Sequence, residues 1–181
     1  MRYIYWDKVL VVDDEFDENL LKKLNKISQT KGFNKSGGIE VGDVLDTKNS
    51  NYSFKELDKD ISKQVETEID RLNVLPIDKE KRVLFRPRLH KLKKGGKLDR
   101  HNDGGYSLAI SLYFNECEGG ELKVENGDGQ NILIEPKWNR LVMLKGENNH
   151  QVNTVHKGVR NSLQVFTQYN LNDSDENRSS T

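Results

Sequence analysis

Hydrophobic residues recur every three or four positions in two stretches of the first half of the chain, which is typical of one face of a helix. The first stretch follows Asp17, a suitable N-cap, and Gly32 is suited to end the helix. The second stretch follows Ser53, also a suitable N-cap, and ends before Pro76. The apolar positions are Leu20, Leu21, Leu24 and Ile27 in the first stretch and Phe54, Leu57, Ile61, Val65, Ile69 and Leu72 in the second.

The segments before and between these predicted helices have a different texture. Residues 8–12, KVLVV, are an apolar run that predicts a short strand, closed by the acidic turn at Asp13 and Asp14. Residues 34–53 are rich in Asn, Ser, Gly, Asp and Lys. This composition predicts a loop, which we expect to act as a lid over a site.

From Val83 onward, short apolar or alternating runs are separated by Gly, Asn and Asp turns. Strands at this spacing indicate a β-sandwich or barrel in place of βαβ units. We therefore expect an α+β or mainly β fold, in which two N-terminal helices pack on a jelly roll. The runs are VLFRPRLHKL, YSLAISLYF, ELKV, NILIEP, RLVML, HQVNTV and NSLQVFTQY.

The length of 181 residues is that of one domain. We expect a single domain over residues 1–171, with helical support and the lid in residues 1–80 and the jelly-roll core in residues 83–170. Residues 172–181 are polar without a hydrophobic period, which predicts a disordered tail.

The composition argues against a membrane protein, a secreted protein and a cysteine-based zinc protein. The chain is 34% hydrophobic and 32% charged, and its 29 basic and 29 acidic residues cancel. It contains no run near the ~18 apolar residues of a membrane helix, and its first residues do not resemble a secretory signal. The lone Cys117 excludes an internal disulfide and a cysteine-based zinc site. We expect a soluble, cytoplasmic protein.

Charge is unevenly distributed despite the net charge of zero. Residues 79–100 contain ten basic and two acidic residues. A charge run of this kind is usually a solvated hairpin, and the alternative is an electropositive wall beside a site that receives an anion. The run carries few aromatic residues for base stacking, which disfavours a nucleic-acid partner.

Histidines in the C-terminal half of the chain are candidate metal ligands. His101 and Asp103 are one residue apart, so in an extended segment their side chains point to the same face and can share one ion. A third ligand must come from another strand, for which His150 and His156 are both candidates. Two imidazoles and one carboxylate form the facial triad of non-haem Fe(II) oxygenases.

The stretch from Leu89 to Tyr169 resembles the catalytic core of the Fe(II)/2-oxoglutarate-dependent dioxygenases, in particular the prolyl 4-hydroxylase-like branch. Several elements carry the resemblance in the same order along the chain. They are LHKLKKGGKLDRHND, with the glycine turn and His-x-Asp; YSLAISLYFNECEGGEL; IEPKWNRLVML; and HQVNTVHKGVRNSLQVF, with a distal histidine and a basic residue ten positions later.

The resemblance implies a double-stranded β-helix (the jelly roll) and a set of site residues. It implies that His101, Asp103 and His150 are the iron ligands. His156 is then either a neighbour of these ligands or exposed, and we expect it to be exposed. We expect His90, on a basic strand, to be either hydrogen-bonded or facing solvent. Arg160 matches the residue that binds the distal carboxylate of 2-oxoglutarate, since a guanidinium offers two parallel donors. Tyr113 matches a tyrosine that binds the same carboxylate, although core packing is an equal alternative. Ser162, two residues after Arg160, is a further hydroxyl candidate.

The activity implied by the resemblance is hydroxylation of a C–H bond, with Fe(II), 2-oxoglutarate and O2, ascorbate as a candidate reductant, and succinate and CO2 as co-products. We expect a peptide or protein substrate, with a peptidyl residue such as proline as the target, and no membrane partner. Leu92 and Leu98 stand where many prolyl hydroxylases have tyrosines, which puts prolyl specificity in doubt. The alternatives are oxidation of a free amino acid or small metabolite, and a non-catalytic cupin-like metal-binding barrel.

Overall fold

The computed structural model of the chain describes residues 2–6, 9–35, 51–73, 75, 82–125 and 131–169. The predicted lid falls largely on residues 36–50, and the predicted tail is residues 172–181. Residues 36–50 and the tail therefore lie outside the described residues, while the two ends of the predicted lid lie in strands β3 (Asn34–Lys35) and β4 (Tyr52–Glu56).

A large, mainly antiparallel sheet forms the centre of the described part of the molecule. Its strand order is β1-β2-β12-β8-β15-β6-β4-β3, and β5 pairs with the far end of β15. The strands are β1 (Arg2–Trp6), β2 (Val9–Asp13), β3 (Asn34–Lys35), β4 (Tyr52–Glu56), β5 (Arg82–Leu84), β6 (Arg88–Lys93), β8 (Leu108–Tyr113), β12 (Arg140–Lys145) and β15 (Val159–Tyr169).

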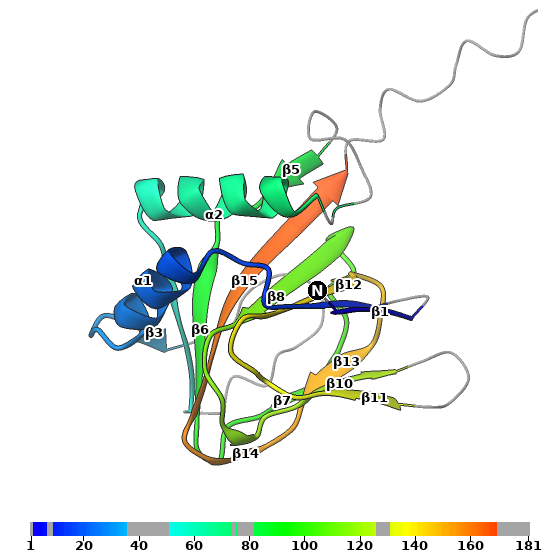
Figure 1. The fold of residues 1–181 in the computed structure, drawn as a ribbon. Helices are drawn as coiled ribbons and strands as arrows, with labels where there is room; N and C mark the ends of the chain where they lie inside the picture. Colours follow the sequence, from blue (N-terminus) through cyan, green and yellow to red (C-terminus); the bar gives the residue numbers. More distant parts are fainter. Residues whose placement is uncertain are drawn as a thin grey trace, which may run out of the picture.

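A smaller antiparallel sheet faces the large one and completes a double-stranded β-helix (Figure 1). Its order is β11-β10-β13-β7, and β9 and β14 pair separately. The bounds are β7 (Leu98–His101), β9 (Glu118–Gly119), β10 (Leu122–Glu125), β11 (Asn131–Ile134), β13 (His150–Val152) and β14 (Val155–Lys157). The predicted β fold with supporting helices is confirmed.

The large sheet separates two hydrophobic cores. Helices α1 (Glu18–Ser28) and α2 (Lys59–Leu72) cover its outer face (Figure 1). Leu24, Val65 and Leu163 of β15 belong to the same buried cluster there. The inner face packs against the small sheet through residues such as Leu92 and Val124. Because side chains alternate along a strand, each central strand contributes to both cores.

The predicted first helix is present, but its end was misplaced. Asp17 caps α1 as expected, since its carboxylate accepts a hydrogen bond from the Leu20 N–H at 2.8 Å. The helix ends at Ser28 with Gln29 as C-cap. Gly32 lies three residues further on, with φ +91°, in the turn that leads to β3.

The predicted start of the second helix was wrong. Ser53 and Phe54 belong to strand β4, and Asp58 caps α2 by accepting from the Ile61 N–H at 2.9 Å. Phe54, Leu57 and Ile61 fit helical spacing, but residues 52–56 gain a full ladder of hydrogen bonds by pairing with β6. That long-range pairing overrides the local pattern. The predicted strand at 8–12 is found as β2, and β1 was not predicted.

Asn139 ties the segment before α1 to the large sheet, and we predict that its loss destabilises the fold. Its buried carboxamide accepts from the Phe16 N–H and donates to the Phe16 carbonyl, each at 3.0 Å, while its backbone is left-handed at φ 54°. Asn139→Ala should lower the free energy of unfolding by about 3 kcal/mol, because two buried backbone groups lose their partners and alanine disfavours this φ. Denaturant unfolding measures this loss.

Asn139→Gly is the matched control, because glycine removes the same hydrogen bonds without the φ penalty. It should be about 1 kcal/mol more stable than Asn139→Ala. An alanine variant within 0.5 kcal/mol of the wild type would contradict the role of this residue.

Candidate metal centre and carboxylate pocket

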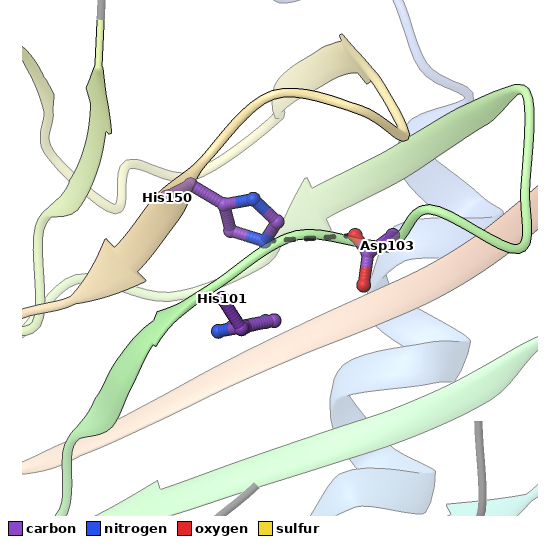
Figure 2. Close-up of side chains that lie close together, drawn as sticks. All are labelled: His101, Asp103 and His150. Carbon is purple, nitrogen blue, oxygen red and sulfur yellow. Dashed lines mark ion pairs between the residues drawn. The ribbon is translucent and has the colours of Figure 1, made fainter. Parts of the chain in front are cut away.

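His101, Asp103 and His150 converge at one end of the small sheet (Figure 2). His101 is the last residue of β7, Asp103 follows it in the next loop, and His150 opens β13. β7 and β13 pair antiparallel with His150 opposite His101. One ligand atom from each side chain lies within 4.8 Å of the others. The structure therefore brings together the three residues that the resemblance implies as ligands, while His156 lies exposed on β14.

Main-chain carbonyls fix the tautomers of both imidazoles. His101 Nδ1 lies 2.7 Å from the Asp99 carbonyl oxygen, and His150 Nδ1 lies 2.9 Å from that of Asn148. A carbonyl can only accept, so each Nδ1 carries the proton and each Nε2 keeps its lone pair. This is the arrangement by which protein groups orient histidine ligands for a metal.

The loop that carries Asp103 is held by its own backbone. The Asp103 N–H donates to the Gly146 carbonyl at 2.7 Å, and the Tyr106 N–H donates to the Asp103 carbonyl at 2.8 Å. Position 146 requires glycine, because a Cβ there would lie 1.9 Å from the Tyr106 carbonyl oxygen. The carboxylate then lies with Oδ2 at 3.5 Å from His150 Nε2.

Burial disfavours the charged forms of Asp103 and His150. It raises the pKa of the Asp103 carboxyl above its usual value, and the neighbouring His150 and His101 oppose that rise. Burial also lowers the pKa of His150, so its imidazole is neutral at physiological pH and its Nε2 is available as a ligand. Two neutral imidazole nitrogens and one carboxylate oxygen suit a divalent iron that keeps open coordination positions.

Arg160 is a buried cation on the inner face of β15. Its side chain is 3% exposed, Nη2 donates to the Tyr113 hydroxyl at 2.9 Å, and Nη1 reaches the Ser162 hydroxyl at 3.4 Å. Among the residues that the structure describes, no Asp or Glu forms an ion pair with it. Since a buried charge is costly without a counter-charge, the guanidinium is suited to receive an anion.

Gly120 leaves room for the stem of Arg160. This glycine has φ +73°, and a Cβ there would lie 3.1 Å from the Arg160 Cδ. Tyr113 is fully buried in the core between the sheets, with its ring 4.8 Å from the Arg160 guanidinium carbon. Tyr113 is therefore a core residue whose hydroxyl accepts a hydrogen bond from the guanidinium, and its contact with the co-substrate carboxylate stays a prediction.

One cavity between the two sheets joins the metal-ligand cluster, which consists of His101, Asp103 and His150, to Arg160. Its apolar wall includes Leu98 and Val152, and its opposite wall includes Gln164 and Phe166 of β15. The same cavity is lined by the candidate ligands His101, Asp103 and His150 and by Arg160. A ligand bound at the cluster can therefore extend to the guanidinium without leaving the protein.

Sequence reasoning missed several residues of this cavity. His90 lines it, buried on β6, and its Nδ1 lies 2.7 Å from the hydroxyl of Tyr52, which lines it from β4. The alternation along β6 could have indicated His90, because it lies two residues from the inward-facing Leu92. Tyr52 could not be found, since its segment was read as the end of a loop.

The basic run mostly forms surface ion pairs. Arg86 and Arg88 both reach Glu56, Lys97 pairs with Asp99, and Arg100 pairs with Glu125. Within the described part of the run, Arg88 is the basic side chain that lines the cavity. This distribution favours the solvated hairpin over a continuous electropositive wall.

Comparison with known proteins finds one family model that is similar to the β core. Residues 87–168 match the family model described as the 2OG-Fe(II) oxygenase superfamily. No curated protein matches the chain. No helix in the described ranges is both long and apolar enough to cross a membrane.

Solved structures share the fold at low sequence identity. A Pseudomonas putida prolyl-4-hydroxylase is 19% identical with a TM-score of 0.72, covering 89% of this chain and 92% of its own. A Trichoplax adhaerens prolyl hydroxylase in complex with a hypoxia inducible factor oxygen degradation domain peptide fragment is 14% identical with a TM-score of 0.74, covering 93% and 88%. The viral collagen prolyl hydroxylase from Paramecium Bursaria Chlorella virus-1, in its 2OG complex, is 12% identical with a TM-score of 0.65, covering 90% and 96%.

The double-stranded β-helix, the His-Asp-His cluster and the family match agree with one another. Residues 87–168 are similar to the 2OG-Fe(II) oxygenase superfamily, and the chain shares its fold with solved prolyl hydroxylases.

Proposed function

We propose that this protein is an Fe(II)- and 2-oxoglutarate-dependent dioxygenase that hydroxylates a C–H bond of a peptidyl residue, with proline as the first candidate, and releases succinate and CO2. The observation that carries the proposal is that one cavity contains both a His-Asp-His cluster and a buried guanidinium without an acidic partner among the described residues. A cupin-like barrel that only binds metal has no use for such a guanidinium.

Each residue of the site has a task in this reaction. His101, Asp103 and His150 would hold Fe(II), which when bound supplies O2 activation coupled to decarboxylation of 2-oxoglutarate. Arg160 binds the distal carboxylate of that co-substrate, oriented by the hydroxyls of Tyr113 and Ser162. The apolar cavity wall, which includes Leu122, Leu144 and Val152, excludes water from the reacting groups.

An aromatic cluster beside this site supports a substrate with an apolar ring. The rings of Tyr106 and Phe166 stack with centroids 4.5 Å apart, and both residues line the cavity. Phe85 packs edge-on against Tyr106 at 4.9 Å. A pyrrolidine ring fits such a surface, and the Trichoplax adhaerens neighbour carries a peptide fragment. The phenols absent at Leu92 and Leu98 leave free amino acids and small metabolites as the second candidate class.

Loss of the carboxylate ligand should abolish metal-dependent binding of the co-substrate. We predict that Asp103→Ala loses the weak visible band that Fe(II) and 2-oxoglutarate give together under anaerobic conditions, and lowers succinate production at least 100-fold. Glu118→Ala removes an exposed carboxylate paired with Lys157 and should keep both signals. Undiminished turnover in Asp103→Ala would show that the ligand assignment is wrong.

Removal of the guanidinium should separate co-substrate binding from metal binding. Arg160→Gln should raise the Kd for 2-oxoglutarate at least 100-fold, because a buried, charge-assisted contact is worth several kcal/mol. Arg160→Lys should raise the Kd for 2-oxoglutarate about tenfold, since lysine keeps the positive charge but lacks the planar guanidinium that donates two parallel hydrogen bonds. Calorimetry under anaerobic conditions measures both values, and the affinity for Fe(II) should stay unchanged. Equal 2-oxoglutarate affinity in Arg160→Gln would contradict the proposal.

The substrate class is tested by turnover on a panel of proline-containing peptides and free amino acids, read by succinate release and a mass gain of one oxygen. A peptide should gain the oxygen, and ascorbate should sustain turnover. Phe166→Ala should lower kcat/KM for that peptide about tenfold or more by removing stacked apolar area. The Kd for 2-oxoglutarate should change little. Oxidation of a free amino acid alone would move the assignment to the second class.

A further inference from the structure

Within the described part of the chain, three buried nitrogen atoms of the cavity lining have no hydrogen-bond partner. They are Arg88 Nε, His90 Nε2 and Arg160 Nε. Unpaired polar atoms are rare inside proteins, so three of them on one wall indicate that this wall is completed by an acceptor-rich ligand. In the proposed function the distal carboxylate of 2-oxoglutarate binds to Arg160, but that function gives no role to the imidazole of His90.

His90 lies next to the guanidinium site on the inner face of the large sheet. It is opposite Ser162 in the pairing of β6 with β15, and its neighbour on the same face, Leu92, is opposite Arg160. His90 is 9% exposed. Its ring packs edge-on against the ring of Tyr52 at 5.4 Å, with Nδ1 2.7 Å from the phenol oxygen. The imidazole is therefore held in place by one of its nitrogens, while the other has no partner among the described residues.

The protonation states of His90 and Tyr52 determine whether Nε2 is a hydrogen-bond donor or acceptor. Burial and the positive charges of Arg160 and Arg88 lower the pKa of His90 to about 3, so the imidazole is neutral. Burial raises the pKa of Tyr52, so its hydroxyl keeps its proton. A phenol is a good donor and imidazole nitrogen a good acceptor, which favours Tyr52 O–H donating to Nδ1. In that tautomer the single ring proton is on Nε2, where the residues described offer it no acceptor.

We propose that His90 donates a hydrogen bond from Nε2 to the distal carboxylate of 2-oxoglutarate beside Arg160, and that Tyr52 is the positioning residue that fixes the ring and its tautomer. This inference rests on the proposed function. The distal end of the co-substrate is the part concerned, because His90 lies opposite Ser162, whose hydroxyl is within reach of the Arg160 guanidinium.

The neutral donor complements the charged one. Arg160 supplies attraction for the anion, while a second cation at His90 would add a buried positive charge when the cavity lacks co-substrate. A co-substrate without a distal carboxylate would leave both donors unpaired in a desolvated site. The pair therefore selects 2-oxo acids by the presence of that carboxylate.

Two substitutions at position 90 separate the two ring nitrogens. Asparagine places its amide near the Nδ1 position and can still bond to Tyr52, whereas glutamine reaches the Nε2 position and keeps a donor there. We expect His90→Asn to raise the Kd for 2-oxoglutarate about tenfold and His90→Gln to stay within about threefold of the wild type. Anaerobic calorimetry with Mn(II) in place of Fe(II) measures these values without turnover.

Comparison of 2-oxoglutarate with 2-oxobutyrate, which lacks the distal carboxylate, distinguishes a direct contact from a structural role. His90→Asn should weaken 2-oxoglutarate and leave 2-oxobutyrate within twofold of the wild type. Equal weakening of both ligands, or no weakening of either, overturns the inference. Failure of the wild type itself to bind 2-oxoglutarate with Mn(II) would instead overturn the proposed function.

Tyr52→Phe provides a test that does not depend on folding of the His90 variants. It removes one hydroxyl and keeps the ring, and should raise the Kd for 2-oxoglutarate about threefold without affecting 2-oxobutyrate. Tyr169→Phe is the matched control, since it makes the same change at the end of β15 on the helix side of the sheet and should change neither Kd. Identical 2-oxoglutarate affinity in Tyr52→Phe and Tyr169→Phe would contradict the positioning role.

Discussion

The guanidinium of Arg160 is a permanent positive charge inside a β-sandwich, and the described residues supply hydroxyls to it but no carboxylate. Such a charge raises the free energy of the ligand-free protein, and a bound anion lowers it again. The surroundings of Arg160 preserve this condition: Gly120 leaves space for its stem, and fully buried Tyr113 holds its outer nitrogen. The buried guanidinium therefore favours binding of an anion, because the fold retains an uncompensated positive charge among the described residues.

The metal-ligand cluster depends on backbone geometry more than on neighbouring side chains. Peptide carbonyls at Asp99 and Asn148 set the tautomers of the two histidines, and the Gly146 carbonyl fixes the loop of Asp103. Because strand pairing and turn conformation place these carbonyls, the cluster is preorganised wherever the small sheet folds. Side-chain differences around it can then alter substrate choice without moving the ligands.

Local signals in the sequence were sufficient for several features. The Asp17 cap, the His101-x-Asp103 spacing and the apolar runs from Val83 onward each depend on neighbours in the chain, and the structure contains the elements they predict. Strand β4 was missed because residues 52–56 fit a helical pattern, and only their pairing with β6 decides between the two. Tyr52 was missed for the same reason, and although alternation along β6 could have indicated His90, its contact with Tyr52 joins residues 38 positions apart. Long-range pairing is not visible in one sequence.

Successive side chains of strand β15 point alternately into the cavity between the sheets and toward the helices. Arg160, Ser162 and Gln164 face the other sheet, while Leu163 and Val165 face the helices. Inserting or deleting a single residue near its start would exchange these two sets, sending leucine and valine into the cavity and the guanidinium under α1 and α2. Point substitutions in this strand can be tolerated one at a time, but a change of length there costs folding and chemistry together. Insertions and deletions in this protein should therefore be tolerated outside β15 and not within it.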